Sequence, residues 1–313
     1  MAGREWRGAY PEIIAYDYLN YPQRGSPTFL TEPVRINKKI DGTRTYSREI
    51  EKSGESDFDG YFAYYDDVFF DVKAFKDNVK EILESIYKEV YSRLKCTDLR
   101  LRGEYSYTHH YEELKSRRKA LVNELVNAFD PERRNTFLRS SVVPEFSFQA
   151  MWGPGTLITM HDHDPYEYAE RYHGEIFNHV DKFVRDKPSF IIYVVFHWSN
   201  LLPDYLSGSK KEFYRAYARR VFCQYRYSPE LMKEKNSDFK GAQTVWEVSN
   251  DISAILFLED KSILGDSRAL TKLDAYWYIN PNAKNRLFRS LPEHWLTTDL
   301  TILILDTFEH DNY

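Results

Sequence analysis

The sequence predicts an α/β fold of the α+β type, with a mixed central sheet flanked by helices. Residues 189–196 form an uninterrupted apolar run, which is typical of a strand buried on both faces. Residues 76–95 carry apolar side chains at intervals of three and four, as an amphipathic helix does. Residues 57–75 place two runs of aromatic and β-branched residues on either side of a polar turn, which predicts a β-hairpin.

The remaining elements follow from the same helical and strand periodicities. The further helices expected are residues 11–19, 111–129, a segment that begins with Asp164 and Pro165, and 209–222. The further strands expected are residues 99–107, 144–152, 252–258 and 300–305. Pro11 is expected in the first turn of its helix, where the missing N–H costs no hydrogen bond. Residues 228–241 are expected to form a loop or a flap.

Length and composition indicate a globular protein with a sizeable core. The chain has 313 residues, of which 42% are hydrophobic and 16% aromatic, so it is not a disordered chain. We expect a single domain over residues 1–313, with a core at about 55–260. Residues 1–54 and 261–313 are expected to be peripheral elements.

The cysteines and the absence of long apolar runs bear on the expected compartment. Cys96 and Cys223 form no C-x-x-C pair, so neither a zinc ribbon nor a disulfide framework is indicated. The first residues lack the apolar stretch of a signal peptide, and no apolar run is long enough to span a membrane. We therefore expect a cytoplasmic protein without a membrane span. The net charge of −5 argues against non-specific coating of nucleic acid but permits a local basic groove.

Charged residues interrupt the apolar runs of the expected hairpin. Asp59 lies in the first run, and Asp71 and Lys73 lie in the second. Because strand side chains alternate between faces, Asp71 and Lys73 point the same way. An even register, with residue 59 opposite residue 71, adds Asp59 to that face, whereas an odd register places it on the other side. The sequence does not decide between the two registers.

Two carboxylates beside a lysine suit metal-assisted chemistry. Mg²⁺ prefers hard oxygen ligands, lowers the pKa of a bound water and neutralises charge that develops on a phosphate. Asp59, followed after eleven residues by Asp71-Val72-Lys73 at the end of an apolar strand, resembles the PD-(D/E)xK nuclease superfamily, which includes many restriction endonucleases. The resemblance covers residues 57–75, and Phe58 stands where many members have proline.

The resemblance implies a restriction-endonuclease-like core with peripheral additions and a Mg²⁺-dependent endonuclease that hydrolyses DNA phosphodiester bonds. Asp59 and Asp71 would bind the metal, and Lys73 would position the attacking water. The size of the chain looks most like that of a restriction-type enzyme, which implies a homodimer. The superfamily also implies an acidic residue on a helix before the first strand, and the spacing does not choose between Glu12 and Glu32.

Basic residues on two expected helices are candidates for nucleic-acid contacts, although a solvated helix face is the commoner explanation of such residues. They are Lys115, Arg117, Arg118 and Lys119 in the first helix, and Arg215 and Arg219 in the second. Gln149 would lie near the metal cluster if the strand at 144–152 neighbours the hairpin. Polar residues of the segment 280–286 can read bases or form a plain loop.

Two other function classes stay open. One is a non-catalytic nucleic-acid-binding protein that keeps the basic helices without cleavage. The other is a cupin-type metalloenzyme, because Gly155, His161, His163, Glu167 and Gly174 match the first cupin metal motif. The second cupin motif is absent, and the sequence from Asp164 onward indicates a helix start rather than a strand.

Overall fold

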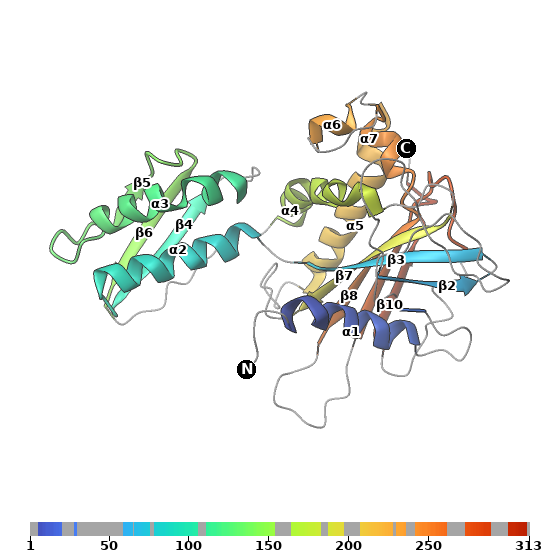
Figure 1. Cartoon of the computed structure of the whole chain (residues 1–313), viewed down its shortest axis with the longest axis horizontal. Helices are drawn as coiled ribbons and strands as arrows, with labels where there is room; N and C mark the ends of the chain where they lie inside the picture. Colours follow the sequence, from blue (N-terminus) through green and yellow to red (C-terminus); the bar gives the residue numbers. More distant parts are fainter. Residues whose placement is uncertain are drawn as a thin grey trace, which may run out of the picture. The chain divides into compact units, whose positions relative to one another are not determined.

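The computed structural model contains two compact units (Figure 1). The first unit comprises Met1–Phe75 and Tyr172–Tyr313, and the second comprises Lys76–Arg171. The structure describes residues 6–20, 28–29, 59–64, 66–75, 78–105, 111–153, 164–182, 187–196, 207–227, 230–235, 242–261, 273–288 and 300–311. The sequence, which predicts one domain, does not separate these units.

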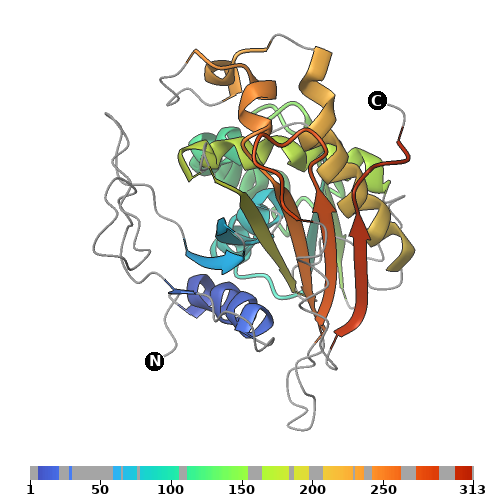
Figure 2. The same cartoon turned by 90° about the vertical axis from the view of Figure 1, so that its right-hand side faces the viewer.

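A seven-stranded mixed sheet forms the centre of the first unit, as the sequence predicted (Figure 2). Its strands, in spatial order, are β1 (Thr28–Phe29), β2 (Gly60–Tyr64), β3 (Asp66–Ala74), β7 (Ser189–Phe196), β8 (Ala254–Asp260), β9 (Leu273–Ile279) and β10 (Leu300–Asp306). The pairs β3–β7, β7–β8 and β9–β10 are parallel, and the other pairs are antiparallel. All of β7 is buried, which confirms the strand predicted from the apolar run at 189–196.

Two long helices cover opposite faces of this sheet (Figure 2). On one face, α1 (Trp6–Asn20) packs an aliphatic and aromatic core that includes Phe70, Ile192 and Trp277. The other face is covered by α5 (Ser207–Cys223), which meets it through aromatic rings. Contrary to the prediction, Pro11 lies inside α1, because the helix already begins at Trp6.

Short helical segments complete the first unit. They are a 3₁₀ helix at His173–Lys182, a second at Gln224–Tyr227, α6 (Met232–Lys235) and α7 (Val245–Ser249). Thr244 caps α7 in a capping box with Glu247, which satisfies backbone N–H groups that the first turn leaves unpaired. The segment 228–241, which was expected to be a loop or a flap, contains the short helix α6.

The second unit is inserted between β3 and β7 and has its own core. Its three-stranded antiparallel sheet has the order β4 (Leu99–Tyr105), β6 (Phe146–Trp152) and β5 (Phe137–Arg139). The helices α2 (Asn78–Leu94) and α3 (Tyr111–Ala128) pack on it around Ile86, Leu121 and Phe148 (Figure 1). The prediction of these helices and of β4 and β6 is confirmed, whereas the three-residue β5 was not foreseen.

The helix α4 (Pro165–Tyr172) begins where the sequence indicated. The Asp164 carboxylate accepts the backbone N–H of Tyr166 at 2.8 Å, and the Asp164 carbonyl accepts that of Tyr168. Glu167 is exposed in the first turn of this helix. Gly155, His161 and His163 of the cupin-like pattern lie outside the described residues.

Candidate active site

The register of the β2–β3 hairpin is even. Gly60 pairs with Phe70 and Tyr61 with Phe69, so Asp59, one residue before β2, stands opposite Asp71. The Oδ2 atom of Asp59 accepts the backbone N–H of Val72 at 2.5 Å. This carboxylate thus takes up a backbone donor at the end of the ladder, where the next residue of β2 would otherwise act. Of the two registers that the sequence left open, the structure has the even one, in which position 59 falls opposite position 71.

Asp71 and Lys73 form an ion pair on one face of β3. The Lys73 Nζ lies 2.7 Å from Asp71 Oδ2, and the two side chains are 23% and 1% exposed. A buried carboxylate is costly unless it is paired, so the lysine compensates the charge of Asp71. Asp71 is thus buried, and only the lysine of the pair reaches solvent.

Aromatic side chains pack next to this pair on the same face of the sheet. Phe75 makes edge-on contacts with a ring of neighbours, namely Tyr172, Tyr193, Phe213, Tyr217 and Phe257. Tyr193 is the register partner of Lys73 on β7, and its hydroxyl lies 2.8 Å from that of Tyr217. Asp71 and Lys73 therefore lie on the face of the sheet that carries this aromatic cluster.

The two buried tyrosines stay neutral. Burial raises the pKa of Tyr193, and the negative charges of Glu175 and Asp71 raise it further. Burial also raises the pKa of Tyr217, as does its proximity to Tyr193 and Glu175. Both hydroxyls are therefore hydrogen-bond donors or acceptors near the acids at neutral pH, not bases.

The upstream acidic residue remains a prediction. Glu12 lies on α1, which packs against the face of β3 that carries Val68, Phe70 and Val72. Asp71 and Lys73 point to the opposite face, because strand side chains alternate. Glu32, the other candidate, lies outside the described residues.

The strand of Gln149 does not join the sheet of the hairpin, so the condition attached to that prediction is not met. Its strand, β6, pairs with β4 and β5 in the second sheet. The Gln149 Nε2 donates to Glu104 Oε1 at 3.2 Å within that sheet. Alternation along a strand shows which residues share a face but does not show which sheet the strand joins.

The basic residues of α3 make ion pairs inside the second unit. Arg117 contacts Glu113 at 3.3 Å and the backbone carbonyl of Val142 at 2.5 Å. Arg118 contacts Glu89 of α2 at 3.0 Å.

The two lysines of this group lie nearer to solvent. Lys115 is exposed, with its ammonium 3.7 Å from Glu112 and over the Tyr111 ring. Lys119 is exposed as well. These two lysines are the residues of the group best placed to meet a phosphate.

Arg215 and Arg219 of α5 form ion pairs with acidic residues of the C-terminal segment. Arg215 contacts Asp306 at 2.7 Å and Asp311 at 2.5 Å, and its guanidinium lies over the Phe308 ring. Arg219 contacts the other oxygen of Asp311 at 3.0 Å. In this state the acidic groups of the chain itself occupy the donors that a phosphate would use.

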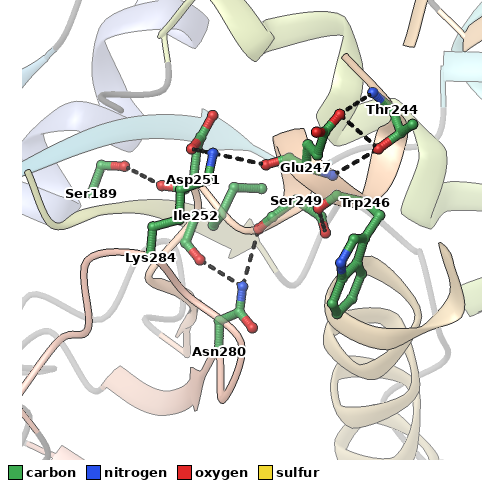
Figure 3. A network of polar contacts seen from close by, with 9 residues as sticks. All are labelled: Ser189, Thr244, Trp246, Glu247, Ser249, Asp251, Ile252, Asn280 and Lys284. Carbon is green, nitrogen blue, oxygen red and sulfur yellow. Dashed lines mark hydrogen bonds and ion pairs between the residues drawn. The ribbon is translucent and has the colours of Figure 1, made fainter. Parts of the chain in front are cut away.

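Polar residues after β9 hold the turn in place through hydrogen bonds and an ion pair (Figure 3). The buried Asn280 amide donates to the backbone carbonyls of Ser249 and Ile252, and its oxygen accepts the N–H of Asn282. Lys284 lies 2.6 Å from the buried Asp251 carboxylate. The plain-loop reading of this segment thus describes Asn280 and Lys284, whose side chains hold the turn in place.

The donor set of the hairpin fits Mg²⁺ in kind. Asp59 and Asp71 supply carboxylate oxygens, and Mg²⁺ is commonly held by one or two carboxylates together with water. Across the residues that the structure describes, no three or more His, Cys, Asp or Glu side chains are grouped so that they could hold a metal ion. Any metal held here by the described residues therefore relies on these two carboxylates and on water.

Comparisons with known proteins leave the family open. No family model matches the sequence, and neither a curated protein nor a solved structure shows significant similarity to it. Among the described residues, no helix is both long and apolar enough to cross a membrane. The assignment of a function therefore rests on the residues themselves.

A second group of charged residues was missed by the sequence analysis. Glu259 and Asp274, on β8 and β9, are buried and face each other in the register. Their signal is the one that singled out Asp71, an acidic residue inside an otherwise apolar strand. Lys210, on the helix expected at 209–222, is buried beside Glu259.

Proposed function

We propose that this protein is a Mg²⁺-dependent endonuclease that acts on DNA phosphodiester bonds, with its active site on the β2–β3 hairpin. The observation that carries the proposal is the register, which sets Asp59 opposite Asp71 with Lys73 beside them. The pattern Asp-x11-Asp-x-Lys at the end of an apolar strand is the one that resembles PD-(D/E)xK nucleases.

Each of the three residues has a distinct role in the proposal. Asp59 and Asp71 would hold the metal through their carboxylates, and bound Mg²⁺ supplies charge neutralisation at the phosphate and a more acidic water. Lys73 would orient the attacking water and stabilise negative charge on the phosphate oxygens. In the described structure its ammonium contacts Asp71, so it already lies beside the carboxylate that would bind the metal.

The surroundings of the site supply rigidity. Phe75 and Tyr193 pack against each other edge-on, next to Lys73, and in this proposal they would limit the directions from which water and substrate approach. A homodimer would present two such hairpins, which is what cleavage of both strands of a duplex requires. Lys115 and Lys119 of α3 are the proposed phosphate contacts.

The test is a cleavage assay on plasmid DNA, single-stranded DNA and RNA, with Mg²⁺, Mn²⁺ or EDTA. Wild type is compared with Lys73→Ala and with Lys88→Ala, a control that removes an exposed lysine of α2. We expect metal-dependent cleavage of DNA by wild type and by the control, and a loss of about 10²–10⁴-fold for Lys73→Ala.

The outcomes separate the function classes. If wild type and Lys73→Ala are equally inactive on every substrate with every metal, the hairpin is structural and the proposal fails. DNA binding without cleavage, measured by gel shift with the same proteins, would then support the non-catalytic alternative.

A further inference from the structure

Two acidic side chains face each other on neighbouring strands of the same sheet. Glu259 of β8 and Asp274 of β9 are register partners in an antiparallel pair. They are 5% and 0% exposed. Directly opposite residues bring their side chains within about 5 Å, and like charges in this position destabilise a sheet. A sheet that keeps two buried acids in this position needs positive charge there.

Two lysines supply this charge, one for each acid, and they differ in how exposed they are. Lys210, from the first turns of α5, is 8% exposed and lies 2.6 Å from Glu259 Oε1. Lys261, just after β8, forms an ion pair with Asp274 Oδ2, and its side chain is 40% exposed. Lys210 is therefore an internal partner, whereas the Lys261 side chain reaches solvent.

One oxygen of the pair is left without a donor. Asp274 Oδ1 is buried and has no hydrogen-bond partner among the described residues. The other oxygen, Oδ2, is shared by Lys261 and the hydroxyl of Tyr276. A buried carboxylate oxygen without a hydrogen-bond donor costs free energy. The fold therefore leaves one negatively charged acceptor unsatisfied at this point.

The surrounding groups define the chemistry of a ligand that would satisfy this oxygen. The oxygen atoms that could bind a cation here belong to the carboxylates of Glu259 and Asp274 and to the phenol of Tyr276. All of them are hard metal ligands. Burial raises the pKa of Tyr276 and of Tyr214 of α5, and the negative charges of Glu259 and Asp274 raise both further. The two acids therefore share one environment. Two acids repel an anion, and a small oxygen-seeking cation suits them best.

We propose that Glu259 and Asp274 form a binding site for a divalent cation of the Mg²⁺, Mn²⁺ and Ca²⁺ class, in which the cation takes the place of the Lys261 ammonium. Asp274 Oδ1 and the carboxylate of Glu259 supply the protein ligands, and water completes the coordination. Lys210 stays in place and lowers the affinity of the site. This inference does not depend on the proposed nuclease function, because its residues lie on β8 and β9 rather than on the hairpin.

The experiment counts Mn²⁺ ions bound to the full chain by electron paramagnetic resonance of the free ion. The variants are Asp274→Asn, Glu259→Gln and Lys261→Gln, with Asp71→Asn as the variant of the hairpin. We expect Asp274→Asn and Glu259→Gln each to lose one bound ion relative to wild type. Lys261→Gln, which keeps both acids and removes the competing ammonium, should bind that ion roughly 2–5-fold more tightly.

The stoichiometry keeps this site and the hairpin apart. If both sites bind, wild type holds two ions, and Asp274→Asn, Glu259→Gln and Asp71→Asn hold one each. If only the β8–β9 site binds, Asp274→Asn and Glu259→Gln lose binding and Asp71→Asn does not. Equal numbers of ions in wild type, Asp274→Asn and Glu259→Gln, all folded by circular dichroism, would overturn the inference. So would unchanged affinity in Lys261→Gln, which tests the site even if the acid variants fail to fold.

Discussion

The carboxylate of Asp59 accepts the backbone N–H of Val72 at 2.5 Å, across the open end of the β2–β3 hairpin. This bond fixes the residue that precedes β2 against β3, on the strand that carries Asp71 and Lys73. Asp59 thus has a structural use as well as the proposed metal-binding one. Substitutions that keep one use and remove the other separate the two.

Asp59→Asn should retain stability and lose activity. The asparagine oxygen still accepts the N–H of Val72, but the charge that would bind a metal is gone. Asp59→Ala should lose activity as well and cost about 1–2 kcal/mol of unfolding free energy. Urea unfolding and the DNA cleavage assay measure both effects. Equal destabilisation by Asn and Ala would show that charge, and not the hydrogen bond, holds this end of the hairpin.

The ion pairs of Arg215 and Arg219 on α5 with Asp311 should make the free energy of unfolding depend on pH in the acid range. Partial burial acts to raise the pKa of Asp311, but hydrogen bonds and charges from Arg215 and Arg219 outweigh it and hold that pKa below its usual range. Because the folded pKa is the lower one, the stabilisation is present above the unfolded pKa of about 3.9 and is lost as pH falls through the folded pKa.

Asp311→Asn should therefore cost about 1 kcal/mol at pH 7 and flatten the loss of stability below about pH 4. Urea unfolding at a series of pH values measures this. Glu212→Gln, a change at an exposed acid of α5, is the control and should follow wild type. Parallel pH profiles for wild type and Asp311→Asn would contradict the prediction.

The basic residues of the two helices should respond differently to neutralisation. Lys115→Gln and Lys119→Gln should each lower the salt dependence of DNA binding by about 0.9 in log–log slope, as the loss of one phosphate contact does. Arg215→Gln should instead lower stability, because it breaks the contacts with Asp306 and Asp311. Gel shifts at several salt concentrations, with Lys88→Gln as control, measure the slopes. Unchanged slopes would remove α3 from the interface.

Asn280 should be among the most sensitive positions of the turn after β9. Asn280→Ala leaves the carbonyls of Ser249 and Ile252 and the N–H of Asn282 without their partner, at about 2–3 kcal/mol (Figure 3). Asn178→Ala, at an exposed position of the 3₁₀ helix, should be nearly neutral. Thermal or urea unfolding compares them, and similar values for the two changes would argue against the fastening role.

Lys210 and Glu259 should show strong energetic coupling. Lys210→Met leaves the buried Glu259 carboxylate without its nearest positive charge and should cost about 3–5 kcal/mol. The double variant Lys210→Met/Glu259→Gln should recover most of this loss, because no buried charge is then left unpaired. Unfolding free energies of the four proteins form the double-mutant cycle, and additive losses would contradict the coupling.

The sequence by itself determined the local elements and which side chains share a face. The hairpin at 57–75, the buried strand β7 and the helices α2, α3 and α5 follow from periodicity, because side-chain direction repeats with the backbone geometry of each element. The alternation rule placed Asp71 and Lys73 together, and their 2.7 Å contact confirms it.

Only the tertiary structure decided which elements become neighbours. The register set position 59 opposite Asp71, β6 with Gln149 joined the second sheet, and the pairing of β8 with β9 brought Glu259 opposite Asp274. Likewise, Arg215 meets Asp311 across 96 positions of the chain. Periodicity describes one element at a time, whereas these partners are chosen by the packing of strands and helices far apart in the sequence.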